Sequence, residues 1–242
     1  MNNCCSELKT SGGIRIRLAT YNVHRFVGRD KIRDIERTGK VLQEIKPDIV
    51  ALQEVEYFRT PEELKDLFHG EQFNMVLGPT IRSGDEHYGN VLLSRFPVTE
   101  KREINLSYPG REARNAVDVD IDCKGEKVRV VATHFGLVPV ERRQQAQRLL
   151  LEIDKNRNSR DDIILLMGDM NEWFLWGRPL RLIHKYFGYC PSPATYPAKL
   201  PLFSLDRIWD HPPGMIESRS VHRTKIAAAA SDHLPLVAVI RI

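Results

Sequence analysis

Short apolar runs recur along the chain and predict a protein rich in β-strands. The runs span residues 14–20, 49–52, 90–94, 116–121, 128–133, 163–167 and 236–242. Several contain almost no polar residue, which is typical of strands that are buried on both faces of a sheet. Two other stretches, 31–45 and 139–154, repeat apolar side chains at helical spacing and predict amphipathic helices. Pro47 ends the first of these stretches and Pro139 begins the second.

The order of these elements indicates an α/β protein with mixed sheets. Consecutive strands from about residue 89 to 133 are joined by short polar turns, such as 123–126, and we expect them to pair as antiparallel hairpins. The chain contains neither a GxGxxG sequence nor a P-loop, so a Rossmann or P-loop fold is not expected. No low-complexity linker interrupts residues 14–242, which we expect to form one catalytic domain behind a flexible N-terminal tail at 1–13.

Polar side chains stand where the predicted strands end or begin. They are Asn22, Glu54, His134, Asp169, Asn171, Asp206, Asp232 and His233. A strand that ends in a carboxylate, an amide or an imidazole holds that group rigidly at the rim of a sheet, where several strands can direct theirs to one point. Any one of these residues alone has a structural explanation, such as a turn or a solvated loop. The recurrence of the feature at six strand ends favours a functional site.

The residue types in this set match the needs of phosphate-ester hydrolysis. Carboxylates bind Mg²⁺ and activate water, amides orient the reactants, and imidazoles move protons or bind an anion. Zinc chemistry is not expected, because the four cysteines form no CxxC pair. A serine-hydrolase site is also disfavoured, because the chain has no GxSxG nucleophile elbow.

A series of short motifs gives these residues a family resemblance. In chain order the motifs are TYNV (20–23), LQE (52–54), YGN (88–90), LSR (93–95), TH (133–134), GDMN (168–171), LDRI (205–208) and SDH (231–233). The ordered series resembles the endonuclease/exonuclease/phosphatase superfamily and extends from about residue 14 to the C-terminus. The resemblance implies a four-layer α/β sandwich, with two mixed, mostly antiparallel sheets flanked by helices and the site at the sheet edges.

The resemblance also implies a metal site. It assigns Glu54 as the main Mg²⁺ ligand, with Asn22 close to the metal or the phosphate and Asp232 near the metal. Mn²⁺ is a plausible substitute for Mg²⁺, because both ions accept carboxylate, carbonyl and water ligands.

Five further roles follow from the same resemblance. Asp169 would polarise the attacking water, and Asn171 would orient the water or the phosphate. Asp206 and His233 would form a hydrogen-bonded dyad, and His134 would bind the phosphoryl oxygens or protonate the leaving group. The Thr-His form at 133–134 resembles pancreatic-type deoxyribonucleases, neutral sphingomyelinases and inositol phosphatases more than abasic-site endonucleases, which usually carry tyrosine there.

Candidate substrate-binding residues are less sharply marked. Trp173 and Trp176 follow the GDMN motif; they either pack in the core or form an apolar surface suited to an acyl chain, a nucleobase or a partner. Arg111 and Arg114 precede a strand and either clamp phosphate with paired guanidinium donors or form salt bridges with nearby glutamates. Asn90, at the end of the YGN motif, is a further candidate.

Composition gives limited information on the partners and the cellular location of the protein. The 242 residues carry 36 Lys and Arg against 32 Asp and Glu, a net charge of +4 that permits a polyanionic partner without requiring one. Residues 181–225 hold seven basic and three acidic side chains, which indicates either a solvated surface or a rim that attracts phosphate. The cysteine pattern, the absence of an apolar signal-peptide region and the lack of a long apolar run favour a cytoplasmic protein, with peripheral membrane association as an alternative. We also expect the protein to be a monomer.

The sequence therefore favours a Mg²⁺-dependent phosphodiesterase that acts on a phospholipid headgroup or a nucleotide-type phosphate ester. A DNA or RNA endonuclease or exonuclease is the alternative within the same chemistry, and would need a basic groove for the phosphate backbone. A non-catalytic lipid- or nucleic-acid-binding module on a hydrolase fold is the third hypothesis, because a fold alone does not establish activity.

Overall fold

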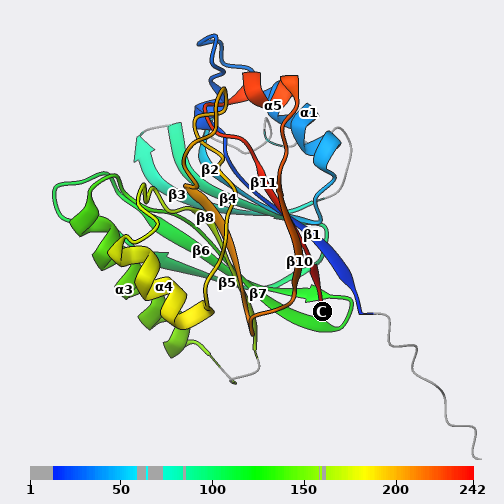
Figure 1. The fold of residues 1–242 in the computed structure, drawn as a ribbon, viewed down its shortest axis with the longest axis vertical. Coiled ribbons are helices and arrows are strands. Elements are labelled where there is room, and N and C mark those ends of the chain that lie inside the picture. The colour runs from blue at the N-terminus through cyan, green and yellow to red at the C-terminus, as the bar shows by residue number, and fades with distance from the viewer. Residues whose placement is uncertain (1–12, 59–63, 65–72, 84–85, 158, 160–161) are drawn as a thin grey trace, which may run out of the picture.

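The computed structural model describes residues 13–58, 64, 73–83, 86–157, 159 and 162–242, and in it the chain forms two β-sheets (Figure 1). The six-stranded sheet has the order β10-β11-β1-β2-β4-β3, with β1 (Arg15–Asn22), β2 (Ile49–Phe58), β3 (Asn74–Ser83), β4 (Glu86–Ser94), β10 (Ile216–Val221) and β11 (Leu236–Arg241). The five-stranded sheet runs in chain order through β5 (Val98–Asn105), β6 (Asn115–Cys123), β7 (Glu126–His134), β8 (Ile163–Asp169) and β9 (Asp206–His211). The helices are η1 (His24–Phe26), α1 (Ile35–Ile45), α3 (Pro139–Lys155), α4 (Arg178–Phe187) and α5 (Lys225–Ala230).

The two sheets pack face to face and are covered by helices on their outer faces. Apolar side chains from both sheets, such as Leu18 and Leu165, fill the space between them. Helices α1 and α5 pack on the six-stranded sheet, where Val41 is among the buried residues, and α3 and α4 pack on the five-stranded sheet around Trp209 (Figure 1). The predicted four-layer α/β sandwich is therefore confirmed.

The predicted pairing of the middle strands needs one correction. Strand β4 does not form a hairpin with its successors, because it lies between β2 and β3 in the six-stranded sheet. The chain crosses to the other sheet after β4, and only β5, β6 and β7 form the expected antiparallel series. Helix α1 is shorter than the predicted 31–45 because it begins after Asp34, whose side chain accepts a hydrogen bond from the Arg37 backbone N–H and caps the helix.

The strand directions explain why the predicted site residues share one edge. Strands β1 and β2 are parallel, and so are β7 and β8, so each pair brings its carboxyl ends together. Strand β9 is antiparallel to β8 and β11 is antiparallel to β1, so the residues that begin β9 and precede β11 reach the same edge. Because the two sheets are stacked, the ends from both form one rim.

A buried ion network ties the five-stranded sheet to helix α3. The Arg129 guanidinium on β7 donates two hydrogen bonds to the Asp118 carboxylate on β6, at 2.8 and 2.6 Å. It also donates to the carbonyl oxygens of Ile153 and Asn156 at the C-terminal end of α3. Arg102 on β5 donates to Asp118 as well, so the buried carboxylate is shared by two guanidinium groups.

The N-terminal tail predicted at 1–13 falls outside the described residues except for Gly13, and so do Cys4 and Cys5. Among the helices that the structure describes, none is both long enough and apolar enough to cross a bilayer.

Candidate active site

A cavity of about 320 Å³ opens at the common edge of the two sheets. It is lined by Asn22, His24, Arg25, Glu54, Tyr88, Glu112, Arg114, His134, Leu137, Asp169, Asn171, Trp173, Tyr196, Leu205, Asp232 and His233. Seven of the eight residues that the sequence places at strand ends are in this lining. The eighth, Asp206, lies directly behind His233.

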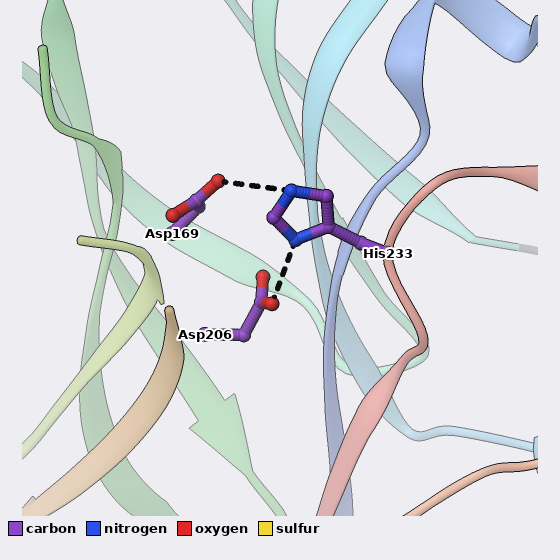
Figure 2. A group of neighbouring side chains, drawn as sticks. All are labelled: Asp169, Asp206 and His233. Carbon is purple, nitrogen blue, oxygen red and sulfur yellow. Dashed lines mark hydrogen bonds and ion pairs between the residues drawn. The ribbon is translucent and has the colours of Figure 1, made fainter. Parts of the chain in front are cut away.

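Each ring nitrogen of His233 faces a carboxylate, one of Asp169 and the other of Asp206 (Figure 2). His233 Nδ1 lies 2.9 Å from Asp206 Oδ2, a hydrogen bond, and the opposite ring nitrogen, Nε2, lies 3.7 Å from Asp169 Oδ2. All three side chains are almost completely buried. The predicted Asp206–His233 dyad is present in this geometry, and Asp169 faces its open end.

The pKa values of Asp169 and His233 are both raised, for different reasons. Burial, together with the Asp206 charge, raises the pKa of Asp169 to about 6, against the opposing attraction of His233. Burial alone would lower the pKa of His233, but the carboxylates of Asp206 and Asp169 outweigh it and raise that pKa to about 10. Near pH 8 the site therefore holds an ionised carboxylate that can accept a proton beside an imidazolium that can bind an anion.

Two neighbours that the sequence analysis did not single out hold the dyad in place. Thr195 Oγ1 donates a hydrogen bond to Asp206 Oδ2 at 2.5 Å, and the Tyr196 ring lies against the His233 imidazole with the ring centroids 4.8 Å apart. Both belong to an irregular segment that is anchored by an isolated antiparallel bridge between Tyr196 and Phe203. No local sequence pattern marks them, because their position depends on this tertiary bridge.

His134 and Asn171 form the second polar pair of the cavity. The Asn171 side-chain amide, Nδ2, donates to the Phe135 carbonyl at 2.8 Å and lies 2.9 Å from His134 Nε2. Burial, reinforced by the nearby positive charges of Arg114 and His233, holds the pKa of His134 well below its usual value. The neutral ring can then accept a hydrogen bond from the Asn171 amide at Nε2. In that state Nε2 has no proton to donate, so both roles that the family resemblance leaves open for His134, binding a phosphoryl oxygen and protonating the leaving group, need a protonated or tautomerised ring.

Glu54 reaches the cavity through a local irregularity in β2. The pairing of β2 with β4 shifts between Leu52 and Val55, and Glu54 adopts a left-handed backbone conformation with φ of 56°. Such a conformation is uncommon for a non-glycine residue and re-aims the side chain away from the regular alternation of the strand. Asn22 then donates from Nδ2 to Glu54 Oε1 at 3.0 Å and to Asp169 Oδ2 at 3.1 Å.

The oxygen donors in the cavity fit a hard divalent cation. Glu54 and Asp232 both present partly exposed carboxylates to the cavity, and Mg²⁺ prefers a few carboxylate oxygens with water completing its shell. Asn22 donates from Nδ2 to the carboxylates of Glu54 and Asp169 and uses its Oδ1 to accept from the His24 backbone N–H, so it orients these two carboxylates. Asp169, Asp206 and His233 also bring one potential ligand atom each within 4.8 Å of one another. A cation there would compete with the proton that His233 holds between the two carboxylates.

Arg114 lines the cavity, whereas Arg111 does not. The Arg114 guanidinium is buried; its Nη1 donates to Glu112 Oε1 at 2.6 Å, and its Nε has no partner among the described residues. The salt-bridge role expected for Arg114 is therefore present, and its role as a phosphate clamp stays a prediction. Arg111 is exposed in the loop before β6 and lies outside the cavity lining.

The remaining predicted substrate-binding residues differ in position. Trp173 lines the cavity, while Trp176 is 71% exposed and lies outside the lining. Asn90 is buried behind the cavity, where its Nδ2 donates to the carbonyl and the side-chain oxygen of Asn115. The geometry gives Asn90 a supporting position between the two sheets, because Asn115 begins β6 in the other sheet.

Comparison with known proteins identifies the family. The sequence model of the Endonuclease/Exonuclease/phosphatase family matches residues 19–233. The chain belongs to this family. Its members are phosphoesterase hydrolases that generally use a divalent metal. The matched span includes every strand-end residue that lines the cavity.

Individual proteins resemble the chain over most of its length. The uncharacterized protein YbhP of Escherichia coli (strain K12) is 27% identical over 213 residues, which cover 80% of this chain and 83% of YbhP. The crystal structure of an endonuclease/exonuclease/phosphatase from Bacteroides vulgatus superposes with a TM-score of 0.76 at 19% identity, covering 95% of this chain and 99% of that one. A mannosyl-6-phosphatase from Bacteroides thetaiotaomicron VPI-5482 superposes with a TM-score of 0.71 at 16% identity, covering 93% and 99% of the two chains. At these identities the solved structures show a shared fold.

Proposed function

We propose that the protein is a Mg²⁺-dependent phosphodiesterase that hydrolyses a phospholipid-headgroup or nucleotide-type phosphate ester by in-line attack of water. The arrangement of Asp169 and His233 carries the proposal. The two side chains face each other across 3.7 Å in one cavity, with environments that make one a base and the other a cation at the same pH. Opposite protonation states of this kind are what a hydrolytic site needs.

Asp169 would act as the general base. Its ionised carboxylate accepts a proton from water as the water oxygen forms a bond to phosphorus and the bond from phosphorus to the leaving oxygen breaks. The protonated His233, held by Asp206, donates a hydrogen bond to a phosphoryl oxygen on the same side. Arg114 contributes further donors to the remaining phosphoryl oxygens, and Asn171, whose two Nδ2 hydrogens face Phe135 and His134, can orient the attacking water through its Oδ1.

Glu54 and Asp232 would hold the Mg²⁺. When bound, the ion supplies Lewis-acid stabilisation of the charge that develops on the phosphoryl and leaving oxygens. Asn22 keeps the Glu54 carboxylate oriented through its Nδ2 hydrogen bond. Asp169 accepts a hydrogen bond from the same Asn22 amide and therefore lies beside the Mg²⁺ site. Glu54, and not Asp169, would be the main ligand.

The charge balance of the cavity supports a diester substrate. Arg114 is paired with Glu112, and the Arg25 guanidinium lies 3.7 Å from the Glu56 carboxylate, so both arginines of the lining are partly neutralised. A phosphodiester carries one negative charge and a monoester carries close to two at neutral pH, so the smaller charge is the better match. Trp173 and Tyr196 add an aromatic wall suited to an acyl chain or a base.

The test is a hydrolysis screen with the purified protein in MgCl₂ and in EDTA. The substrates are bis-p-nitrophenyl phosphate, p-nitrophenyl phosphate, phospholipid vesicles, a nucleotide diester, plasmid DNA, RNA and an abasic-site oligonucleotide. We expect Mg²⁺-dependent cleavage of the small diester and of a lipid or nucleotide diester, with weaker action on the monoester. A preference for the monoester would overturn the diester assignment, and cleavage confined to DNA or RNA would favour the nuclease alternative.

A matched pair of variants separates catalysis from binding. Asp169→Asn keeps the size of the side chain and removes the base, so we expect kcat for the small diester to fall at least about 100-fold. Asp154→Asn makes the same chemical change on the exposed surface of α3 and should leave kcat unchanged. Full activity in Asp169→Asn would exclude Asp169 as the base. No cleavage of any substrate by a wild-type protein that still binds Mg²⁺ in calorimetry would leave the non-catalytic binding module as the better hypothesis.

A further inference from the structure

Large apolar side chains are exposed on the segments that contain the cavity-lining residues Leu137, Trp173 and Tyr196. They are Leu137, Phe174, Leu175, Trp176, Leu200 and Leu202, each at least 55% exposed, and we call them the apolar rim. Single exposed apolar residues are normal on soluble proteins, but a group of them marks a surface that binds a ligand, another protein or a membrane. The rim therefore needs an occupant.

Trp173 joins the two main halves of the rim into one surface. It directly precedes residues 174–176, and its indole contacts the rings of Tyr196 and Phe203 at centroid distances of 5.6 and 4.7 Å. Tyr196 and Phe203 pair in an antiparallel bridge that closes the turn 197–202, which carries Leu200 and Leu202. Contact through Trp173 thus places both segments side by side.

The rim also borders the catalytic groups. Leu137, Trp173 and Tyr196 line the same cavity as Asp169 and His233. A surface that covered the rim would therefore lie across the mouth of the cavity. Molecules in that covering surface would then reach Asp169 without leaving the surface.

The charged residues within the segments that carry the rim all have one sign. The segments 137–140, 173–181 and 196–203 contain no aspartate or glutamate, and their charged residues are Arg178, Arg181 and Lys199, all of them exposed. Tryptophan and leucine side chains flanked by arginine and lysine are typical of protein surfaces that lie in the interface of a bilayer and attract anionic headgroups. Stacking on single-stranded nucleic acid would need π-faces along a basic track, and four of the six rim residues are leucines.

We propose that the apolar rim docks the protein on an anionic lipid bilayer, so that the cavity takes its phosphodiester from lipid headgroups at that surface. This inference rests on the proposed phosphodiesterase function for its substrate, and on the rim alone for the docking. Rim side chains enter the headgroup region, while Arg178, Arg181 and Lys199 contact anionic headgroups.

The first test measures binding to sucrose-loaded vesicles by sedimentation in EDTA. Wild-type protein is mixed with vesicles of phosphatidylcholine containing 30% phosphatidylglycerol, or of phosphatidylcholine alone. We expect binding to the anionic vesicles, a partition coefficient roughly tenfold or more lower in Phe174→Ser/Trp176→Ser, and one roughly fivefold lower in Lys199→Gln. Leu151→Ser is the matched control, because Leu151 on α3 is 71% exposed, as Trp176 is, and lies about 16 Å along the helix from its first turn.

Tryptophan fluorescence provides a second readout on the unmodified protein. The chain has three tryptophans, of which Trp209 is buried and Trp173 and Trp176 are at the rim. Anionic vesicles should shift the emission to shorter wavelength, and brominated lipids should quench it. Trp176→Phe should lose most of this response, while retaining the signal of the buried Trp209.

The outcomes separate docking from catalysis. If wild type binds no vesicles, or if the rim variants bind them as well as wild type does, the docking proposal is wrong. It is also wrong if light scattering shows a wild-type dimer that the rim variants convert to monomers, or if the rim variants lose single-stranded DNA binding and keep vesicle binding. Vesicle binding without hydrolysis of any diester would leave the docking intact and remove the proposed function. Hydrolysis of bis-p-nitrophenyl phosphate should be unchanged in the rim variants, and its loss would show damage to the cavity and overturn the separation of roles.

Discussion

Replacing Asp169 by asparagine should make the protein more stable while it removes activity. The Asp169 carboxylate is buried, and its pKa is raised from 3.8 to about 6. A shift of about 2 units corresponds to roughly 3 kcal/mol by which the folded protein disfavours the ionised form. The variant has no charge to bury, but it weakens the hydrogen bond from Asn22 to Asp169 Oδ2, a loss of roughly 1 kcal/mol. The expected net gain at pH 8 is therefore about 2 kcal/mol.

The pH dependence of this gain has a definite sign. The folded protein binds the Asp169 proton more tightly than the unfolded chain does, so wild-type stability decreases as pH rises from about 4 to about 6 and this contribution is constant above that range. Asp169→Asn lacks this decrease. The stability difference between variant and wild type should therefore be small at pH 4, grow up to about pH 6 and remain constant to pH 8.

Urea unfolding followed by circular dichroism, in EDTA at pH 4.5, 6 and 8, measures the difference directly. Asp154→Asn provides the background for an exposed carboxylate and should give a change within about 0.5 kcal/mol at each pH. The explanation is refuted if Asp169→Asn is no more stable than wild type at pH 8. It is equally refuted if the variant gains the same amount at pH 4.5 as at pH 8, because the gain would then not come from the carboxylate charge.

Three further predictions use the same protein and small-diester assay. The pH profile of kcat/KM should fall tenfold per pH unit below about pH 6, because protonated Asp169 cannot accept a proton; a flat profile from pH 4.5 to 8 would exclude it as the base. Arg114→Ala should raise KM about tenfold with a smaller change in kcat, and Arg114→Lys should restore less than half of the loss, because a lysine cannot replace the paired guanidinium donors; equal KM values would remove Arg114 from the substrate site. Asp118→Asn should destabilise the protein by roughly 3–5 kcal/mol in urea unfolding, because Arg129 and Arg102 lose their shared buried counter-ion; a loss under about 1 kcal/mol would contradict this role.

The site could be predicted to the extent that it is built from strand ends. Asp169 ends a run that is apolar throughout, and His134 ends the neighbouring one, so their placement follows from chain direction once β7 and β8 pair in parallel. The strands that the apolar pattern does not reveal are those exposed on one face or mostly charged, such as β5, in which Ile104 is the buried residue. A strand can be recognised from an apolar run in the sequence when both of its faces are buried.

Other parts of the site depend on contacts that sequence spacing does not encode. Thr195 and Tyr196 contact the dyad only because the irregular segment before β9 folds back through its bridge to Phe203. Glu54 faces the cavity because the chain departs from regular strand geometry at that residue. Both are tertiary effects, in which packing of distant segments decides the local backbone.

The carboxylates differ in how deeply they are buried at the common edge of the two sheets, and this difference explains how one edge can hold groups of different function. Asp169 lies between the two sheets with its side chain 1% exposed, whereas the Glu54 side chain is 21% exposed. Burial opposes ionisation, so the deeper carboxylate is the one with a pKa high enough to accept and release a proton near neutrality. The shallower one is open to the water that would complete the shell of a bound Mg²⁺. Under the proposed function, stacking two sheets so that their strand ends differ in depth would be enough to give one carboxylate the role of base and another the role of metal ligand.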